Sequence, residues 1–363
     1  MQLTIVAGAR PNFMKIAPLI NAIKQAQSKG VNIAFRLIHT GQHYDKNMSA
    51  TFFEELGIPY PDINFNVGGG TQAEQTAKIM IEFEKEIIAH PSDLVVVVGD
   101  VTSTMACAIV AKKQNTKVAH IEAGIRSWDM TMPEEINRIV TDSLADFFFT
   151  TSEVANKNLR HQGVEEDRIF FVGNVMIDTL LANINKFKKP AFFDELNLQE
   201  GQYIVLTMHR PANVDDLSNL QTTLQEIINC SNGLPIVFPV HPRTANILKN
   251  AKLKVDNLRF VEPLGYLEFN YLVKHSKAVV TDSGGITEET TVMGIPCLTL
   301  RDNTERPETC TIGTNELIGT NPKNIAPALE KLFAGEWKKG GIPELWDGKT
   351  SERIVDILQK KFS

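Results

Sequence analysis

The sequence predicts an α/β fold of two Rossmann-like, doubly wound domains, each built on a parallel sheet. Short apolar runs of strand length alternate with longer amphipathic stretches along the whole chain, which has 363 residues. Several of the short runs, such as Leu94–Val98, are apolar at every position, which predicts strands that helices cover on both faces. The length is comfortable for two domains and long for a single core.

The first series of predicted elements occupies the N-terminal half of the chain. Its strands are expected at 2–7, 32–39, 93–98, 117–121, 146–150 and 168–172. The segments 71–90 and 153–162 show the amphipathic spacing of helices. These elements define an N-terminal Rossmann-like domain over residues 1–186.

A second series begins after a polar, proline-containing stretch at 187–201, which we predict to be the linker. Its strands are expected at 203–207, 235–240, 258–261, 277–281 and 296–300. The final segment, 351–362, has the pattern of a helix. The predicted division is therefore a second Rossmann-like domain over 187–345 and a C-terminal helix within 346–363 that packs back on the first domain.

Composition excludes several classes of protein. A hydrophobic fraction of 43% and a charged fraction of 22% are typical of globular proteins, and the net charge of −6 argues against nucleic acid as a partner. No apolar segment approaches the roughly 20 residues that span a bilayer, and the N-terminus predicts a strand instead of a signal peptide. Together with four scattered cysteines, these observations predict a cytoplasmic protein with reduced thiols and no membrane contact.

Neither a metal site nor a redox cofactor site is predicted. The cysteines have no CxxC spacing, and the eight histidines form no HExxH motif. No GxGxxG follows the first strand of either half, and the run Gly68-Gly69-Gly70 lacks the third glycine and the acidic partner of a dinucleotide site. We therefore expect no metal and no nicotinamide or flavin cofactor.

The turn after the predicted strand at 277–281 has the chemistry of a phosphate site. The small residues Ser283, Gly284 and Gly285 lead into a helix, so backbone N–H groups and the positive end of the helix dipole can face one anion. An acidic residue one turn later, Glu288 or its neighbour, is within reach of sugar hydroxyls, which favours a nucleotide sugar over a bare phosphate. An ordinary turn, in which the glycines only relieve crowding, is the alternative.

Charged residues follow most of the other predicted strands. Because ligands of open α/β sheets bind beyond the carboxyl ends of the strands, we expect these residues to meet in a cleft between the two domains. Each has an ordinary structural role as the alternative, such as helix capping for Asp100 or a solvated charge for Arg10. The residues are Arg10, Lys15, Asp100, Glu122, Arg126, His209, Arg210, His241 and Arg243.

Glu134 adds a third carboxylate to this set. It follows Pro133 at a predicted helix start, where proline and glutamate are favoured for helix stability alone. Together with Asp100 and Glu122, it would supply acid and base groups for proton transfer on a sugar. The cations and helix ends would then hold the diphosphate.

Seven separated segments are together far more specific than any single glycine turn. They are GARPNFMK at 8–15, VGD at 98–100, HIEAGIRS at 120–127, PEEINR at 133–138, HRP at 209–211, DSGGITEE at 282–289 and RDNTERPE at 301–308. In this order they resemble the signature segments of the non-hydrolysing UDP-N-acetylglucosamine 2-epimerases, over nearly the whole chain. The resemblance implies a GT-B-type fold, a homodimer, no cofactor, and UDP and UDP-N-acetylglucosamine as small-molecule partners.

The resemblance also implies a reaction, the reversible epimerisation at C2 of UDP-N-acetylglucosamine to UDP-N-acetylmannosamine for cell-surface polysaccharide precursors. Asp100, Glu122 and Glu134 correspond to the catalytic carboxylates of the family, and His209 to a catalytic residue beside the diphosphate. Departure of UDP from C1 creates a cation-like centre next to C2, so a modest carboxylate base can remove the C2 proton. Re-addition of UDP after protonation on the other face gives the epimer.

The remaining implied roles concern the nucleotide. Glu289 would bind the ribose hydroxyls, and Phe269 with the backbone of Leu264 would contact the uracil. The residues implied to surround the diphosphate are Arg10, Lys15, His209, Ser283, Gly284, Gly285 and Arg306.

One departure from the family pattern concerns a second, allosteric substrate site of many bacterial members. Those members carry an arginine in the segment that corresponds to 68–72, and a His-Arg-Arg-Glu run where this chain has HRPA at 209–212. Gln42, Arg210 and His241 are the candidates for such a second site here. The departure argues against activation by UDP-N-acetylglucosamine.

Alternative functions stay open at this point. A GT-B glycosyltransferase would use the same nucleotide cradle, but it needs an acceptor groove and has no need of three carboxylates. A hydrolysing 2-epimerase, or an epimerase of a related UDP-2-acetamido or 2,3-diacetamido sugar, would share the fold. A non-catalytic nucleotide-sugar sensor would have no use for the carboxylate set.

Overall fold

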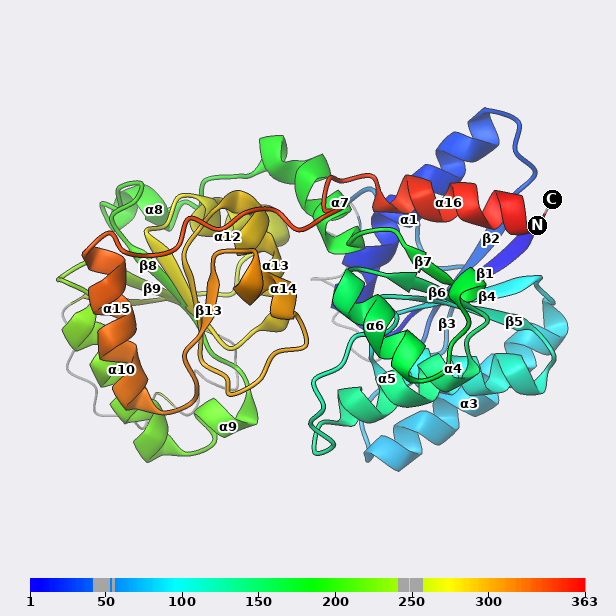
Figure 1. The fold of residues 1–363 in the computed structure, drawn as a ribbon, viewed down its shortest axis with the longest axis horizontal. Helices are drawn as coiled ribbons and strands as arrows, with labels where there is room; N and C mark the ends of the chain where they lie inside the picture. Colours follow the sequence, from blue (N-terminus) through cyan, green and yellow to red (C-terminus); the bar gives the residue numbers. More distant parts are fainter. Residues whose placement is uncertain (42–52, 54–55, 241–247, 249–256, 363) are drawn as a thin grey trace. The chain divides into compact units, whose positions relative to one another are not determined.

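The computed structural model describes residues 1–41, 53, 56–240, 248 and 257–362 (Figure 1). The chain divides into two compact units, each an α/β structure with its own parallel sheet, which confirms the predicted fold class. Unit 1 comprises Met1–Ala182 together with Glu344–Ser363, and unit 2 comprises Asn183–Pro343. Within the described part of the chain, no helix has the length and apolar character needed to cross a membrane.

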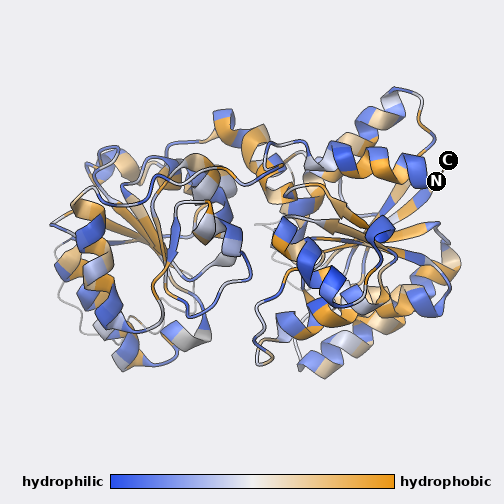
Figure 2. Ribbon diagram, viewed as in Figure 1, coloured by the Kyte–Doolittle hydropathy of each residue, from blue (hydrophilic) through white to orange (hydrophobic). Residues whose placement is uncertain are grey.

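Unit 1 is built on a seven-stranded sheet in the order β3-β2-β1-β4-β5-β6-β7, with parallel pairing throughout. The central strand β4 is buried at every position because helices cover both faces of the sheet, and the strands are accordingly the most apolar part of the unit (Figure 2). The strands are β1 (Gln2–Ala7), β2 (Ala34–His39), β3 (Ile63–Asn64), β4 (Leu94–Val98), β5 (Lys117–Ile121), β6 (Phe147–Thr150) and β7 (Ile169–Phe171).

The helices of unit 1 pack apolar faces against this sheet. Helix α3 begins with a capping box, in which the Thr71 hydroxyl accepts the Glu74 N–H and the Glu74 carboxylate accepts the Thr71 N–H. Its buried face carries Ile79, Phe83 and Ile87 at helical spacing. The helices are α1 (Arg10–Ser28), α3 (Gln72–Ala89), α4 (Thr102–Lys113), α5 (Pro133–Leu144), α6 (Glu153–His161), the 3₁₀ turn Glu166–Arg168, α7 (Val175–Asn183) and α16 (Thr350–Lys361).

Unit 2 is built on a six-stranded parallel sheet in the order β10-β9-β8-β11-β12-β13. Its strands are β8 (Ile204–Thr207), β9 (Ile236–Pro239), β10 (Leu258–Val261), β11 (Ala278–Thr281), β12 (Cys297–Thr299) and β13 (Asn315–Leu317). Its helices are the 3₁₀ turn Ile184–Lys186, α8 (Phe192–Glu195), α9 (Pro211–Val214), α10 (Leu217–Cys230), α12 (Tyr266–Lys274), α13 (Gly284–Met293), α14 (Pro307–Thr311), the 3₁₀ turn Pro322–Asn324 and α15 (Ile325–Phe333).

Two strands, β3 and β13, escape the sequence analysis. They have two and three residues, so neither produces an apolar run that can be read from the sequence. Most of the predicted strands are one or two residues longer than the observed strands, because the chain turns where the hydrogen bonds to the neighbouring strand end. The strand expected at 32–39, for example, begins at Ala34.

The polar stretch 187–201, which we predicted as a linker, packs against unit 2. Phe193 is buried, and its ring meets that of Tyr203 edge-on at 5.6 Å. The N–H of Gly201 donates to the carbonyl of His275 at 2.8 Å. In the structure the boundary between the units falls earlier, at the end of α7.

The C-terminal helix α16 belongs to unit 1, where Asp178 of α7 caps its start. The Asp178 carboxylate accepts the N–H groups of Thr350 at 3.0 Å and Ser351 at 2.7 Å. These are two of the N–H groups that have no partner within a helix. Just before the helix, Trp346 is buried and its indole N–H donates to the carbonyl of Thr151 at 3.0 Å.

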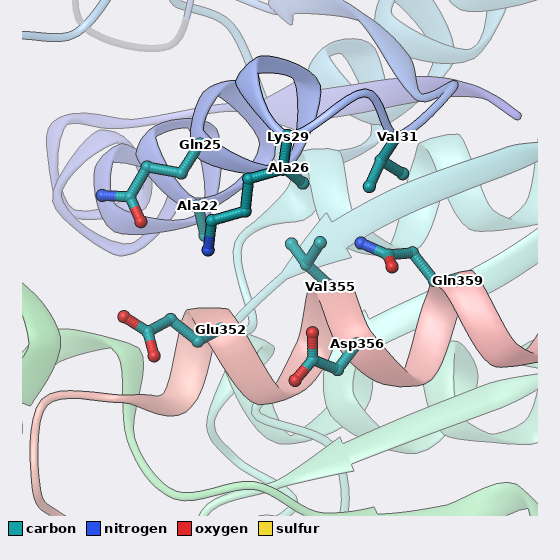
Figure 3. Close-up of a pocket in the computed structure, with 9 residues that line it drawn as sticks. All are labelled: Ala22, Gln25, Ala26, Lys29, Val31, Glu352, Val355, Asp356 and Gln359. Carbon is teal, nitrogen blue, oxygen red and sulfur yellow. The ribbon is translucent and has the colours of Figure 1, made fainter.

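Helix α16 lies beside α1, and a small pocket opens between them (Figure 3). The buried side chains of Ala22 and Ala26 on α1 leave room for Val355 on α16. Polar side chains, including Lys29 and Glu352, form the rim of the pocket (Figure 3). The apolar contact and the Asp178 cap together attach α16 to unit 1.

The cap leads to a prediction about stability. Burial raises the pKa of Asp178, against the opposing effect of its bonds to Ser351 and Thr350. The substitution Asp178→Ala would leave two buried N–H donors without an acceptor, so the free energy of unfolding should fall by about 1–3 kcal/mol. Urea denaturation measures this loss, and hydrogen exchange should show faster exchange of the α16 amides.

The matched control is Asp356→Ala, which removes an exposed carboxylate from the same helix. Exposed substitutions of this kind usually change stability by less than about 0.5 kcal/mol. Equal losses in the two variants would contradict the capping role of Asp178.

Candidate active site

The candidate residues of each unit gather at the switch point of its sheet. In unit 1 the chain order reverses between β1 and β4, and in unit 2 between β8 and β11. Crossover connections leave in opposite directions at such a point, so the loops after the two strands diverge and leave a crevice at the carboxyl edge. Because the polar motifs follow the strands directly, they lie at this edge.

In unit 1, Asn12 bridges the two strands of the switch point. Its side-chain oxygen accepts the N–H groups of Gly8 at 3.2 Å and Ala9 at 3.0 Å, and its amide donates to the carbonyl of Val98 at 3.0 Å. The side chain is 2% exposed, so these bonds are shielded from water. Asn12 therefore fixes the start of α1 relative to the end of β4.

Lys15, one turn further along α1, forms an ion pair with Glu122 at the end of β5. The Lys15 Nζ and Glu122 Oε2 atoms are 2.7 Å apart, and the side chains are 12% and 2% exposed. A Cβ atom on Gly99 would lie 3.0 Å from Lys15 Nζ, so this glycine gives the lysine room to pass. Glu122 has a φ of +68°, a conformation that side chains other than glycine rarely adopt and that often marks functional sites.

Asp100 follows β4 and is bound from α5. The Nη1 atom of Arg138 is 2.5 Å from Asp100 Oδ2, and the Asn137 amide donates to the Asp100 carbonyl at 2.8 Å. The Asp100 side chain is 27% exposed and lines a pocket that Glu134 and Ala9 also line. Two of the three predicted carboxylates thus face one pocket of unit 1.

The adjacent acids Glu134 and Glu135 have different environments. Glu134 is exposed, whereas Glu135 is fully buried, accepts the N–H groups of Ser127 at 2.9 Å and Trp128 at 3.0 Å, and pairs with Arg138 at 2.7 Å. Burial would raise the pKa of Glu135, but these hydrogen bonds and the charge of Arg138 outweigh it and lower the pKa. Glu135 therefore holds the loop before α5, and Glu134 remains accessible.

In unit 2, Asp282 at the end of β11 organises the turn after β8. Its carboxylate accepts the N–H groups of His209 at 3.0 Å and Arg210 at 2.9 Å, and lies 2.9 Å from His209 Nδ1. Burial would raise the pKa of Asp282, but the bonds from His209, Arg210 and Asn213 outweigh it and lower the pKa. The His209 ring is fixed at Nδ1, while the side chain stays 52% exposed.

Helix α13 begins directly after this aspartate. Ser283 is its N-cap residue, yet the Ser283 hydroxyl makes no capping bond, and the Ser283 N–H donates to Thr281 Oγ1 at 3.0 Å. A Cβ atom on Gly284 would lie 2.7 Å from Glu305 Oε1, whereas one on Gly285 would meet nothing within 4 Å. The first N–H groups of a helix lack partners within it, so this turn has the donors that an anion needs.

An ion pair lies beside the start of α13. Arg301 Nη2 and Glu305 Oε2 are 2.7 Å apart, with side chains 5% and 10% exposed. Burial would raise the pKa of Glu305, but the charge and hydrogen bond of Arg301 lower it to about 2. A side chain at position 284 would therefore displace Glu305 from Arg301.

Arg306 and Glu289 have protein partners of their own. Arg306 Nε is 2.5 Å from Glu288 Oε1, and both side chains are buried. Glu289 is 4% exposed and accepts the hydroxyl of Tyr266 at 2.9 Å. Burial, opposed by the Tyr266 bond and reinforced by the charge of Glu288, raises the pKa of Glu289 to about 7.

The residues expected at the uracil lie on and just before helix α12. Leu264 precedes the N-cap residue Gly265, Phe269 lies within the helix, and both pack half-buried against the core of unit 2. Tyr266 lies three residues before Phe269, on the same helix, and reaches Glu289 on α13. The predicted uracil and ribose groups thus belong to one α12–α13 cluster.

Four predicted residues lie wholly or partly outside the described residues, and a fifth, Arg210, lies in the turn after β8. Gln42, His241 and Arg243 lie outside the described residues, and Arg10 begins α1 but its side chain also lies outside them. Arg210 donates through Nε to the carbonyl of Asp282 at 3.0 Å, which makes it part of the β8–β11 turn.

Four buried residues hold these clusters together and were given no role from the sequence. Helical spacing offered a signal for Arg138, which follows Glu135 by three residues, and Arg301 precedes its partner Glu305 by four. The roles of Asn12, Arg138 and Tyr266 depend on partners far along the chain. In the part of the chain that the structure describes, no group of three or more His, Cys, Asp or Glu side chains is arranged to hold a metal ion. The four residues are Asn12, Arg138, Tyr266 and Arg301.

Comparisons with known proteins show the family to which the chain belongs. Residues 25–359 match the sequence model of the UDP-N-acetylglucosamine 2-epimerase family. The UDP-N-acetylglucosamine 2-epimerase of Methanocaldococcus jannaschii is 43% identical over 99% of both chains. The UDP-2,3-diacetamido-2,3-dideoxy-D-glucuronate 2-epimerase of Pseudomonas aeruginosa is 39% identical over 99% of this chain and 100% of its own.

A solved structure of the M. jannaschii enzyme, in complex with UDP-GlcNAc and UDP, superposes with a TM-score of 0.89 at 41% identity, covering 99% of this chain and 100% of that one. The fold is accordingly of the GT-B type, as predicted. The family match and the full-length relatives lead to the same assignment: this chain belongs to the UDP-N-acetylglucosamine 2-epimerase family, a family of isomerases.

Proposed function

We propose that the protein interconverts UDP-N-acetylglucosamine and UDP-N-acetylmannosamine by elimination and re-addition of UDP, in the supply of cell-surface polysaccharide precursors. The proposal includes action as a homodimer in the cytoplasm. The observation that carries it is the division of chemistry between the units, with acid–base groups at the switch point of unit 1 and an anion-binding turn at that of unit 2. Both are needed to eliminate a diphosphate and move a proton.

The residues of unit 2 would bind the leaving UDP. The free N–H groups at the start of α13 and the His209 ring suit a diphosphate, whose negative charge grows as the bond from C1 to oxygen breaks. Asp282 would keep the His209 ring in place for that role. Glu289 would accept hydrogen bonds from the ribose hydroxyls, and Phe269 and Leu264 would contact the uracil.

The residues of unit 1 would act on the sugar. Asp100 and Glu134 line one pocket, and Glu122 lies beside it with Lys15. One carboxylate removes the C2 proton as UDP leaves C1, which gives a sugar with a double bond between C1 and C2. A carboxylic acid then returns a proton to C2 on the other face, and UDP adds again at C1.

A single experiment tests the reaction class. In deuterated water, proton NMR of the purified chain with UDP-N-acetylglucosamine should show both nucleotide sugars, with deuterium only at C2, because the base exchanges its proton with solvent. No metal or nicotinamide is added. Accumulation of free N-acetylmannosamine and UDP would favour a hydrolysing enzyme, and no exchange without an acceptor would favour a glycosyltransferase.

An epimerase of a 2,3-diacetamido sugar is the second candidate. It is favoured by the 39% identity to the P. aeruginosa enzyme, which is nearly as high as that to the M. jannaschii enzyme. The two candidates share the diphosphate and C2 chemistry and differ in the sugar substituents at C3 and C6. The ratio of kcat/KM for the two nucleotide sugars decides between them.

Substitutions in the two units should have different effects. Asp100→Asn, Glu122→Gln and Glu134→Gln should each lower kcat by about 10²–10⁴-fold, because they remove a proton carrier, and leave the Kd of UDP nearly unchanged. His209→Asn should instead weaken UDP binding by about 1.5–3 kcal/mol, because it removes a hydrogen bond to a charged group. Calorimetry with UDP and NMR rates measure the two effects.

The control is Glu82→Gln, an exposed carboxylate on α3 that should change neither quantity. A carboxylate variant that keeps most of its turnover would show that this residue is structural. Normal UDP affinity in His209→Asn would remove that residue from the diphosphate site.

The raised pKa of Glu289 predicts pH-dependent binding. Ribose hydroxyls donate to the ionised carboxylate, which with a pKa of about 7 is a minor form at pH 6 and the major form at pH 8. The Kd of UDP-N-acetylglucosamine, whose diphosphate does not titrate in this range, should therefore fall by about tenfold between pH 6 and pH 8. Glu289→Gln should flatten the profile; a profile that stays unchanged in this variant would assign the titration to another group.

A further inference from the structure

A buried chain of polar groups in unit 1 plays no part in the chemistry proposed so far. The His120 Nδ1 atom lies 2.6 Å from Asp142 Oδ1, and Arg126 Nη2 lies 2.6 Å from Asp142 Oδ2; all three side chains are fully buried. On its other side, His120 Nε2 lies 2.8 Å from the carbonyl oxygen of Gly99. His120 lies on β5, Asp142 on α5 and Gly99 after β4.

Both ring nitrogens of His120 face groups that only accept hydrogen bonds. The Gly99 carbonyl has no proton to give. Burial would raise the pKa of Asp142, but the charges and hydrogen bonds of His120 and Arg126 outweigh it and lower the pKa, so Asp142 is a carboxylate. The His120 ring therefore bridges the Asp142 carboxylate and the Gly99 carbonyl.

The chain of bonds connects the two turns that carry the candidate carboxylates. Through His120, Asp142 reaches the carbonyl of Gly99, which is the residue before Asp100. Directly, Asp142 accepts the N–H of Gly124 at 3.0 Å, two residues after Glu122. One buried carboxylate therefore holds the backbone on the Asp100 side and on the Glu122 side at once.

Both turns need such a hold, because their backbones are in unusual conformations. Gly99 and Gly124 have φ values of +68° and +77°, and Glu122 has a φ of +68°. A left-handed conformation at a non-glycine residue persists only where surrounding contacts determine it. Burying charged side chains is also costly, so a buried ion pair with nothing to position would be better replaced by apolar residues.

We propose that His120 and Asp142 are positioning residues, which set the separation of Asp100 and Glu122 by tying their two turns together. This inference rests on the proposed function, because proton transfer to and from one carbon requires the two carboxylates to be held at a fixed spacing. Misplacement of a reacting group by about 1 Å can cost about 10²-fold in rate without affecting ground-state binding elsewhere.

Two substitutions of His120 separate its two bonds. The amide nitrogen of glutamine is the same number of bonds from Cα as Nε2 of histidine, and that of asparagine the same number as Nδ1. His120→Gln can therefore keep the bond to Gly99, and His120→Asn the bond to Asp142. Because the tie between the two turns needs both bonds, each substitution should lower kcat by about 10²-fold.

The readouts are kcat and KM for UDP-N-acetylglucosamine, the Kd of UDP and the Tm. The fall in His120→Asn should be in kcat alone, with the Kd of UDP unchanged, since UDP is bound by unit 2. Asp142→Asn replaces one of the two acceptor oxygens by a donor nitrogen, so the bond to His120 or the bond to Gly124 is lost, and kcat should fall similarly. Its control is Asp178→Asn, another buried aspartate of unit 1 that accepts two backbone N–H groups, which should lower Tm but not kcat.

Several outcomes would overturn the inference. Equal kcat values in His120→Asn, His120→Gln and the original chain, with only Tm reduced, would make the network structural. A loss of kcat in only one of the two His120 variants would show that the two turns are not tied through both bonds, and a loss in Asp178→Asn as large as in Asp142→Asn would remove the role of position. An original chain with no exchange at C2 would overturn the proposed function and this inference with it.

Discussion

The loops that follow the two strands of a switch point diverge, and they leave backbone N–H and carbonyl groups that no neighbouring strand can pair. In each unit, one buried side chain forms hydrogen bonds to these groups. Asn12 does so in unit 1, bonding Gly8, Ala9 and Val98. Asp282 does so in unit 2, bonding the turn after β8. Lys15, Asp100 and His209 lie in or directly after segments that one of these side chains fixes, so their positions depend on satisfying buried backbone groups.

The partners of the carboxylates explain their different character. Asp100 and Glu122 each meet a cation that a helix supplies, Arg138 and Lys15, which orients them at the sheet edge. Glu289 has only neutral hydrogen-bond donors among its described partners, and it lies beside a second acid. Burial is then not compensated, and this is why the pKa of Glu289 rises while that of Glu305, beside Arg301, falls.

Particular residues show how far sequence reasoning reaches. The motif at 133–138 contains two adjacent glutamates, and helix propensity alone cannot show which of them is accessible, because both suit a helix start. The structure separates them, since Glu135 is buried on Arg138 and Glu134 lines the pocket. Arg306, which the resemblance assigns to the diphosphate, pairs with Glu288, a partner eighteen residues away that no local pattern indicates.

The sequence by itself determined the two parallel sheets, the positions of their main strands along the chain and the sheet edge at which the polar motifs lie. These follow from apolar periodicity and from polar motifs that directly follow strands, which are local properties of the chain. Short edge strands such as β3, and the attachment of 187–201 to unit 2, were decided by tertiary contacts, because pairing and burial there compensate for weak local patterns.

The tertiary structure alone decided which charged groups meet. The ion pair of Lys15 with Glu122 joins residues 107 positions apart, and the pair of Asp100 with Arg138 joins residues 38 apart. Electrostatic interaction depends on distance in space and on exclusion of water, and sequence spacing fixes neither once two residues belong to different elements.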